Sequence, residues 1–459
     1  MKEDDILNKS DAQYKRMMET PIPRLITTLS IPTVVSSLIT VIYNTADTYF
    51  VSQIDKSASA AVGAVFSIMT IIQALGFGLG VGAGSLISRR LGAKDNAAAD
   101  KYASSAFAAS VLVGAIIGIV GLTFLEPILR FLGCTDTMMP HAIPYARFIL
   151  IAAPLNCATF VLNTTLRSEG LSLLSMIGIT SGGILNMILD PILINGFNLG
   201  TGGAAIATMA SQTVSFTILF CFFLFGKSIV KINIKSVSRK FADYQAIVTT
   251  GIPTIFRQGL ASVASAALNI QAIEYGLDAA GAAMTIANKV YMLVRNIIVG
   301  LGQGFQPAAG YNFGAGNKKR TWECFTFSVK VGTAICLIFG GFSALFAEQI
   351  MWFFCDDAEV AALGTKALYF FCACIPFMAF STFVNQLYQG LGFKLQATFL
   401  ASCRQGICFL PVIWLLPLAI GITGVQSAQS IADIGTFFIS IPFLIIFYKK
   451  YIKETEKAI

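Results

Sequence analysis

Charged side chains are scarce in this chain. Of its 459 residues, 12% are Asp, Glu, Lys or Arg and 55% are hydrophobic. A soluble domain typically carries about 25% charged residues, so the composition excludes an ordinary soluble protein. The apolar residues come in runs long enough to cross a bilayer as helices, whereas a transmembrane β-barrel would show short alternating segments. We therefore expect an all-α polytopic membrane protein.

Residues that carry enzymatic and metal chemistry are also rare. The single histidine, His141, leaves no histidine proton relay, and none of the ten cysteines forms a CxxC pair with matching partners. The nearest match to a phosphate-binding loop is GKS at 226–228, but Cys221 occupies the place of its first glycine. We expect neither an enzyme nor a cofactor, so any energy coupling must use an ion such as H⁺ or Na⁺.

Twelve apolar segments have the length that a bilayer-spanning helix needs, which is about 20 residues. The charged N-terminal stretch before the first of them is followed by no small-residue cleavage pattern, so that first segment is expected to be retained. The predicted spans are 25–51, 58–81, 98–123, 139–163, 171–192, 200–226, 245–274, 280–307, 322–346, 362–388, 396–419 and 422–448.

Basic residues lie on one side of this twelve-span arrangement. They cluster in the N-terminal segment, in the loops 88–101, 226–240 and 317–320, and in the C-terminal tail, whereas the opposite loops carry mainly acids. Short loops rich in Lys and Arg stay in the cytoplasm. We therefore expect a multi-pass protein of the cell (plasma or inner) membrane with both termini cytoplasmic. The same distribution accounts for the net charge of +8 without a nucleic-acid-binding surface.

The two halves of the chain match at a nearly constant offset. LSIPT at 29–33 recurs as TGIPT at 250–254, and GLGVGAGSLISRRLGA at 78–93 recurs as GLGQGFQPAAGYNFGA at 300–315. The second pair of stretches is separated by 222 residues. Single residues match at the same separation, among them Pro154 with Pro376, Asn163 with Asn385 and Gly170 with Gly392. Six spans per repeat is an even number, so the halves share one orientation and are related by a pseudo-two-fold axis along the membrane normal.

The duplication predicts the organisation of the chain. The expected parts are a cytoplasmic N-terminal segment (1–24), an N-lobe (25–226), a cytoplasmic linker (227–243), a C-lobe (244–449) and a cytoplasmic tail (450–459). Two such lobes suit alternating access, in which one lobe rocks against the other around a central site. The glycines at every second position from Gly76 to Gly84 are expected mainly to allow close helix packing, with bending as a secondary role.

Few carboxylates lie inside the predicted spans. A carboxylate in hydrocarbon costs about 2.5–3.5 kcal/mol on insertion scales and indicates a functional site by default. Asp47, in YNTADTYF, has no Lys or Arg within seven residues on either side. Asp190, in NMILDP, follows Asn186 by four residues, so both side chains lie on one helix face. Pro191 then frees a backbone carbonyl nearby.

Four polar residues of the N-lobe are predicted to share one depth near the outer side of the membrane. They are Asp47 late in the first span, Asn186 and Asp190 late in the fifth, and Thr208 early in the sixth. Two carboxylates, an amide and a hydroxyl form a hard-oxygen set suited to a small cation. Alternatively, two close carboxylates share a proton, or each acid makes a local structural hydrogen bond.

Other ionisable residues inside the spans have less defined roles. Asp433 has Gln426 and Gln429 nearby as local partners, and Glu274 lies at a helix end. Lys289 and Arg404 are expected to extend toward the membrane surface or to pair with backbone carbonyls. Arg257 and Arg295 are candidate counter-ions in a cleft between the lobes.

Several of these stretches together resemble the multidrug and toxic compound extrusion (MATE) family over nearly the whole chain. They are the IPT of both halves, the first-span aspartate, RRLGAKD (89–95), NMILDP (186–191), GTGGAAIAT (200–208) and NFGAGN (312–317). The resemblance implies two six-helix lobes that face each other as a V. It also implies cation-coupled export of amphipathic, often cationic, compounds.

The resemblance also implies where the coupling site lies. The family branch with an acidic first helix places its cation site on residues that are here Asp47, Asn186, Asp190 and Thr208, with Tyr43 one turn before Asp47. If the ion is Na⁺, the first four would be its ligands. Asn163 would line the same cavity. Another branch uses carboxylates in the seventh and tenth helices, and this chain has none in the middle of those spans.

We therefore expect an antiporter in which H⁺ or Na⁺ from outside neutralises Asp47 and Asp190 while the substrate leaves. The ion and the substrate must favour opposite conformations. Further substrate-binding candidates, by position alone, are Phe50, Gln258, Met284 and Met292, although helix packing would also explain each. The alternative is a lipid-linked oligosaccharide flippase of the same wider superfamily. An ion channel fits the duplication poorly, and a monomer is the default.

Overall fold

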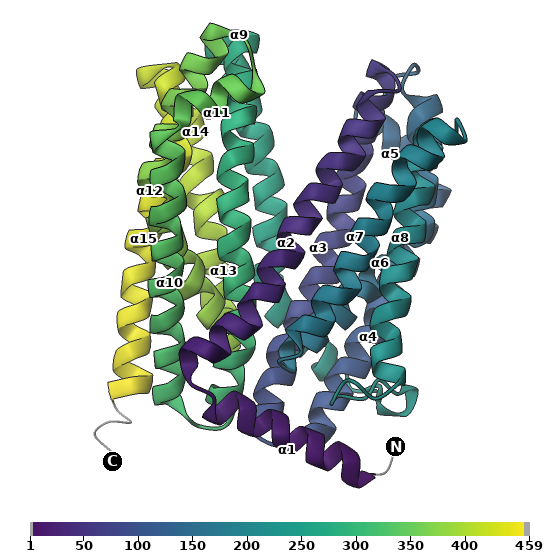
Figure 1. The fold of residues 1–459 in the computed structure, drawn as a ribbon, viewed down its shortest axis with the longest axis vertical. Helices are drawn as coiled ribbons and strands as arrows, with labels where there is room; N and C mark the ends of the chain where they lie inside the picture. The colour runs from purple at the N-terminus through teal and green to yellow at the C-terminus, as the bar shows by residue number, and fades with distance from the viewer. Residues whose placement is uncertain (1–2, 454–459) are drawn as a thin grey trace.

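The computed structural model describes residues 3–453, and over this range the chain is built of helices without β-strands. Figure 1 shows two helical bundles that meet at one end and diverge toward the other, as in a V. The first bundle contains the helices α2 to α8 and the second contains α9 to α15. The expected layout of twelve helices in two lobes is therefore confirmed. We call the end where the bundles meet the closed end and the other the open end.

The spans of the N-lobe coincide with the first six predicted segments. They are α2 (Ile22–Ser52), α3 (Lys56–Gly92), α4 (Asn96–Thr123), α6 (Met139–Ser168), α7 (Ser172–Pro191) with the π-helical turn η1 (Ile192–Gly196), and α8 (Gly200–Leu224). The short helix α5 (Leu125–Phe131) joins α4 to α6. Long apolar runs form helices here because a helix satisfies all its backbone hydrogen bonds internally, as the hydrocarbon region requires.

The C-lobe repeats this plan, with one break in a span. Its elements are α9 (Phe241–Gly314), α10 (Lys318–Leu345), α11 (Ala347–Phe354), α12 (Ala358–Gly390), α13 (Lys394–Ser402), η3 (Cys403–Cys408), α14 (Phe409–Ile420), α15 (Ile422–Phe447) and η4 (Tyr448–Lys453). The predicted span 396–419 thus contains a π-helical segment, η3, between two α-helices. Such segments in the middle of a helix often accompany functional or strained sites.

The helix α9 accounts for two of the twelve spans. As a straight rod its 74 residues would extend about 110 Å, but the helix folds back on itself. Gly251 and Gly310 both contact α3, and Arg257 and Arg295 line one cavity. Among the described residues eleven helical segments are long and apolar enough to cross a membrane, and the second half of α9 is one of them. The first half carries polar residues such as Arg257, so composition alone does not select it.

The duplication is visible in matched local geometry. The side-chain amides of Asn163 and Asn385 each donate to the backbone oxygen twelve residues further on, at 3.1 and 2.7 Å. The turns that follow α3 and α9 also match, because Lys94 (φ 58°) and Gly316 (φ 79°) both adopt the left-handed conformation. Two halves with the same sequence pattern therefore fold into the same sequence of helices and turns.

Alternate glycines of α3 face two different helices. Gly76, Gly80 and Gly84 contact α6, whereas Gly78 and Gly82 contact the first half of α9. A Cβ at Gly82 would lie 2.2 Å from the backbone oxygen of Ile247, so a larger residue would push the two lobes apart there. Close helix packing, the main role expected for these glycines, is what the structure shows.

Hydrogen bonds reinforce this contact between the lobes near the closed end. The hydroxyl of Ser30 on α2 donates to the backbone oxygen of Leu301 (3.1 Å), and that of Thr33 donates to the oxygen of Gly300 (2.6 Å). The hydroxyl of Ser85 on α3 lies 2.9 Å from the backbone oxygen of Gln389. The first half of α2 is thus held by the C-lobe, while its second half packs in the N-lobe.

The helix α1 (Glu3–Glu19) crosses the closed end beneath both lobes (Figure 1). On the N-lobe side, Gln13 donates to the backbone oxygen of Glu169 (2.8 Å). On the C-lobe side, Arg320 donates to the backbone oxygen of Thr20. Within the predicted cytoplasmic N-terminal segment (1–24), the described residues therefore brace the two lobes. The last part of the predicted tail, 454–459, lies outside the described residues.

Glu169, at the end of α6, fixes the linker between the lobes. Its Oε2 accepts a hydrogen bond from the N–H of Ile229 (2.7 Å), and its Oε1 lies 2.7 Å from Oγ of Ser228. That hydroxyl also lies 2.8 Å from the backbone oxygen of Val230. Burial raises the pKa of Glu169 from 4.5 to about 8. A neutral Glu169 fits these contacts, because it can donate to Ser228 while the single hydroxyl hydrogen goes to Val230.

Docking of the linker should therefore weaken in alkaline solution. A raised pKa in the folded state favours the neutral acid, so this contribution is complete below pH about 4.5 and is lost as the pH rises through about 8. Trypsin cleavage at Lys231 and Lys235 should accelerate between pH 6 and pH 9, relative to a free linker peptide. Glu169→Gln, which keeps the donor and the acceptor, should abolish this acceleration.

Two variants control this experiment. Glu169→Ala should expose the linker at every pH, because unsatisfied buried groups cost about 1–3 kcal/mol. Glu126→Gln, an exposed acid at the start of α5, should behave as the wild type. Equal acceleration in the wild type and in Glu169→Gln would show that Glu169 does not control the linker.

Candidate ion and substrate site

Asp47 lies near the open end of α2 and is 9% exposed. Its Oδ2 accepts a hydrogen bond from the hydroxyl of Tyr145 on α6 (3.1 Å). Its Oδ1 is buried and has no hydrogen-bond partner. The carboxylate is therefore half satisfied, which is costly in a low-dielectric interior.

Tyr145 was not selected from the sequence. A depth argument could have found it, because α6 starts at its open end with Met139 and Tyr145 follows within two turns. It therefore lies at the depth of Asp47. Tyrosine is unremarkable by composition in a membrane span, so only the geometry identifies it as the hydrogen-bond donor of the carboxylate.

The polar cluster on α7 and α8 forms as expected. The amide Nδ2 of Asn186 donates to Oδ1 of Asp190 (3.2 Å) and lies 3.4 Å from Oγ1 of Thr208. Asp190 is fully buried. Its Oδ2 and the Oδ1 of Asn186 have no hydrogen-bond partner. The amide thus uses its donors within the cluster and leaves two acceptor oxygens open.

Two glycines one turn before Asn186 allow the neighbouring helices to approach this cluster. A Cβ at Gly182 would lie 2.8 Å from the backbone oxygen of Ser211 on α8, and one at Gly183 would lie 3.0 Å from the ring of Tyr43 on α2. The pair therefore lets both α2 and α8 pack closely against α7. This packing brings the side chains of three helices to one place.

The five residues predicted to couple transport to an ion do come together in the N-lobe. Asp190 interacts electrostatically with Asp47, and Tyr145 interacts with both carboxylates. Tyr43 interacts with Asp47 as well. Three buried acceptor oxygens in this cluster lack a donor. Oxygen atoms in that situation can accept a proton or coordinate a small cation.

The donor set is not that of a transition metal. No group of three or more His, Cys, Asp or Glu side chains that could hold a metal ion occurs in the described part of the chain. A cation here would depend on the amide of Asn186 and the hydroxyl of Thr208 in addition to two carboxylates. Such hard oxygen ligands favour ions of the alkali or alkaline-earth type.

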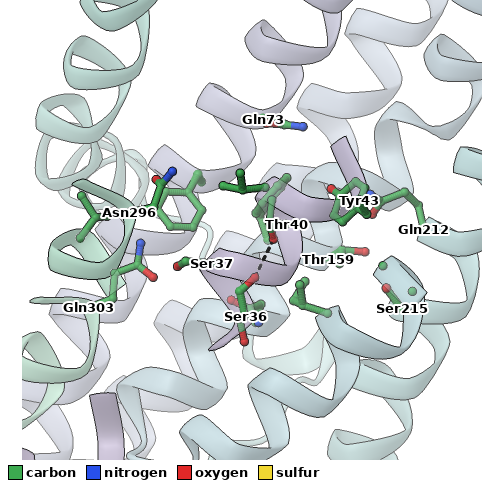
Figure 2. Close-up of a pocket in the computed structure, with 18 of the residues that line it drawn as sticks. Ser36, Ser37, Thr40, Tyr43, Gln73, Thr159, Gln212, Ser215, Asn296 and Gln303 are labelled. Atoms are coloured by element: carbon green, nitrogen blue, oxygen red, sulfur yellow. Dashed lines mark hydrogen bonds between the residues drawn. The ribbon is translucent and has the colours of Figure 1, made fainter. Parts of the chain in front are cut away.

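A cavity lies between the lobes beside this cluster. Figure 2 shows it flanked by Asn296 and Gln303 of α9 on one side, by Tyr43, Gln212 and Ser215 on the other, and by Ser36, Ser37 and Thr40 of α2 between them. Tyr43, Asn186 and Thr208 belong to its wall, whereas Asp47 and Asp190 are buried behind them. The cluster therefore adjoins the cavity without opening widely into it.

The residues expected to line the substrate cavity divide into two groups. Asn163 and Gln258 lie in its wall. Met284 is in the hydrophobic core of the C-lobe with 1% exposure, and Phe50 packs against the core near the open end of the N-lobe. Met292 contacts Nη1 of Arg295 through its sulfur (3.9 Å), and it is Arg295 that lines the cavity. For Phe50, Met284 and Met292 the packing explanation fits their positions.

The acid of the C-lobe is fully paired. Asp433 accepts hydrogen bonds from Nε of Arg404 (2.7 Å), from the hydroxyl of Tyr291 (2.5 Å) and from the amide of Gln429 (3.1 Å). The sequence predicted Gln429 as a local partner. It did not predict the ion pair with Arg404, which was expected to extend toward the surface or to pair with carbonyls. The π-helical segment η3 contains Arg404, and Asp433 lies on the adjacent α15.

Glu274 also has a partner, because its Oε2 accepts a hydrogen bond from the amide of Gln271 (2.8 Å). Glu274 is exposed, and Asp433 has a donor at each oxygen, whereas Asp47 and Asp190 each keep one buried oxygen without a donor. The unsatisfied carboxylates of the described spans are those of the N-lobe.

Two helical lobes with a cavity between them, and half-satisfied acids beside that cavity, are an arrangement typical of membrane transporters. Comparison with known proteins makes this more specific. The sequence profile of the MatE family matches residues 32–192 and 253–415. The chain therefore belongs to the MATE family of transporters.

Individual relatives cover nearly the whole chain. The multidrug export protein MepA of Staphylococcus aureus (strain MRSA252) is 28% identical over 438 residues, which are 92% of this chain and 93% of that protein. The outward-facing structure of a multidrug resistance MATE transporter of the MOP superfamily has a TM-score of 0.91 at 27% identity, covering 95% of this chain and 98% of that one.

A third relative is distinguished by the polarity of its binding pocket. It is a MOP-superfamily transporter from Pyrococcus furiosus, for which a binding pocket of reverse polarity is said to suggest a different function. Its TM-score is 0.88 at 27% identity, covering 95% of this chain and 98% of that one.

The pairing of Asp433 predicts a structural role that can be measured. Asp433→Asn should lower the stability of the protein in detergent by about 3–5 kcal/mol, because it leaves the buried charge of Arg404 unpaired. Thermal unfolding should show this as a lower Tm, while Asp356→Asn, at an exposed acid, should change the Tm little. Replacing both partners by Arg404→Met and Asp433→Leu should cost less than Asp433→Asn alone. An Asp433→Asn variant with wild-type Tm and no transport would instead make Asp433 a coupling residue.

Proposed function

We propose that this protein is a cation-coupled antiporter that exports amphipathic organic compounds by alternating access. H⁺ or Na⁺ enters from the open end, binds at Asp47, Asn186, Asp190 and Thr208, and the substrate leaves from the adjoining cavity. The observation that carries the proposal is the group of buried acceptor oxygens without donors beside that cavity. An unsatisfied carboxylate is costly in a membrane interior, and a bound cation removes that cost.

The helix α2 is suited to transmit this binding. Pro32 removes one backbone hydrogen bond of the helix. The hydroxyls of Ser36, Ser37 and Thr40 bond to backbone oxygens four residues earlier, at 2.9 Å each. Such back-bonding bends helices easily. Because α2 carries Asp47 at one end and contacts the C-lobe at the other, a bend near Pro32 would link cation binding to the arrangement of the lobes.

Exchange of the ion for the substrate requires that the two stabilise opposite conformations of the protein. Cation binding at Asp47 and Asp190 neutralises charge behind the cavity wall and favours one conformation of α2. Substrate in the cavity favours the other. By linkage each then weakens the equilibrium binding of the other to the same extent.

Relatives support the direction and the range of substrates. MepA is named for multidrug export, and the structural relative of known conformation is named for multidrug resistance. We therefore propose export of several organic compounds from the cell across the plasma membrane, with both termini cytoplasmic and the open end outside. The relatives give the flippase alternative no support. A monomer with lipid around its spans suffices for this mechanism.

The test is transport into or out of vesicles driven by one ion at a time. A pH gradient and a Na⁺ gradient are imposed in separate experiments. The reconstituted wild type should move an amphipathic dye under one of them, and the gradient that drives this movement identifies the coupling ion. Asp47→Asn and Asp190→Asn should each lose gradient-driven movement at least about tenfold, since each removes an anionic ligand. Glu126→Gln is the matched control. Wild-type rates in both Asn variants would contradict the assignment of the site.

A further inference from the structure

The charge of the cavity wall indicates a substrate class. The charged residues that line the cavity are Arg167, Arg257 and Arg295, and no Asp, Glu or Lys of the described chain is part of this wall. We propose that the exported compound carries an anionic group, such as a carboxylate, sulfonate or phosphate ester, which Arg257 and Arg295 of the C-lobe bind. The inference rests on the proposed export function and revises the expectation that substrates are often cationic.

Arg257 has the features of an unfilled anion ligand. Its Nη1 is buried and has no hydrogen-bond partner. The charged groups that act on it are other arginines, Arg295 and Arg404. A guanidinium with a buried, unpartnered nitrogen among like charges is unfavourable unless an anion joins it. A planar guanidinium also matches the geometry of carboxylate and phosphate oxygens.

Arg295 is compensated only in part. The nearby acid is Asp433, but Arg404 and Tyr291 already occupy both oxygens of that carboxylate. The contact of Arg295 at its Nη1 is the weak acceptor sulfur of Met292, at 3.9 Å. The group of Arg257, Arg295, Arg404 and Asp433 thus has an excess of two positive charges, and two of its arginines face the cavity.

Arg167 has a different, structural role. It donates to Oε1 of Gln303 across the lobes, and its guanidinium lies 5.4 Å from the ring centre of Phe77. In contrast to Arg257, Arg167 has no buried nitrogen without a hydrogen-bond partner. It adds positive potential to the cavity, but the direct anion ligands are the two arginines of α9.

The rest of the wall fits an amphipathic molecule. Phe77, Phe160, Ile179 and Val299 provide apolar surface, while amides and hydroxyls such as Gln258 provide adaptable hydrogen bonds. The acids of the N-lobe lie behind the wall on the opposite side. The two ligands of the exchange would therefore use opposite lobes, with the cation in the N-lobe and the anionic group of the substrate at α9.

A pair of dyes with the same ring system and opposite charge tests this inference. Sulforhodamine B is the anionic probe and rhodamine 6G is the cationic one. Binding to purified protein in detergent is measured by fluorescence anisotropy, and transport is measured in vesicles under the ion gradient. The variants are Arg257→Gln, Arg295→Gln and, as the matched control, Lys289→Gln, which removes an exposed charge from the same helix.

The wild type should bind sulforhodamine B more tightly than rhodamine 6G. Arg257→Gln and Arg295→Gln should each weaken binding of the anion about tenfold or more and leave the weak binding of the cation unchanged or improved. Lys289→Gln should resemble the wild type. Because Gln keeps a polar hydrogen-bonding group while removing the charge, a comparable Tm for all variants will separate ligand loss from unfolding.

Each contrary outcome is distinguishable from failure of the proposed function. Gradient-driven transport of rhodamine 6G with no binding of sulforhodamine B would overturn the anion assignment and leave the antiporter proposal intact. Arginine-dependent binding of the anion without transport under either gradient would support the assignment and contradict the antiporter.

A fluorescent anionic phospholipid serves as a second probe. Its arginine-dependent movement would place the anionic group on a lipid and also supports the assignment.

Discussion

The fold of this protein depends on one constraint, which is that a polar group placed in hydrocarbon must find a partner within the protein. Most groups do. Asp433 has three donors, and Glu169 is fixed between the backbone and a hydroxyl. Among ionisable side chains in the described chain, buried atoms without partners belong to Asp47, Asp190, Arg257 and Arg320. Arg320 lies at the closed end and donates through Nη2. Arg257 lines the central cavity, and Asp47 and Asp190 are buried behind its N-lobe wall.

The same constraint shapes the contact between the lobes. At the closed end, glycines of α3 let backbones touch, and hydroxyls such as that of Thr33 donate to backbone oxygens of the other lobe. In these contacts the polar groups are satisfied by neutral hydroxyls and backbone oxygens, with no charged side chain. Toward the open end the lobes diverge, and the unsatisfied acceptors and donors are found there on opposite sides of the cavity. The two halves of the duplicated frame thus differ, because unsatisfied carboxylates lie behind the N-lobe wall of the cavity and Arg257 lies in its C-lobe wall.

Sequence reasoning recovered the parts of this account that depend on position along a helix. Long apolar runs gave the spans, the charge of the loops gave an orientation that stays a prediction, and the repeat gave two lobes. Depth along each span was enough to select Asp47, Asn186, Asp190 and Thr208, which the structure brings together. The depth of a residue in the membrane can be estimated from sequence, because each residue lengthens a helix by a fixed rise.

The parts that sequence reasoning missed depend on rotation about the helix axis and on neighbours distant in the chain. Tyr145 and Arg404 each meet an acid on another helix, and no pattern within α6 or η3 indicates this. Met284 was placed in the cavity by its position, but the packing of α9 turns it into the core. The continuity of α9 and the bracing role of α1 also follow from tertiary contacts rather than from local pattern.

In the proposed mechanism, cation binding at the N-lobe acids changes the arrangement of the lobes. The most direct measurement is the distance between spin labels at positions 53 and 356, at the open ends of the two lobes, in a transport-competent variant without native cysteines. Raising the concentration of H⁺ or of Na⁺ should shift the distance distribution, and the shift should vanish in Asp47→Asn with Asp190→Asn while persisting in Glu126→Gln. The same shift in the doubly substituted protein and in the wild type would contradict the account.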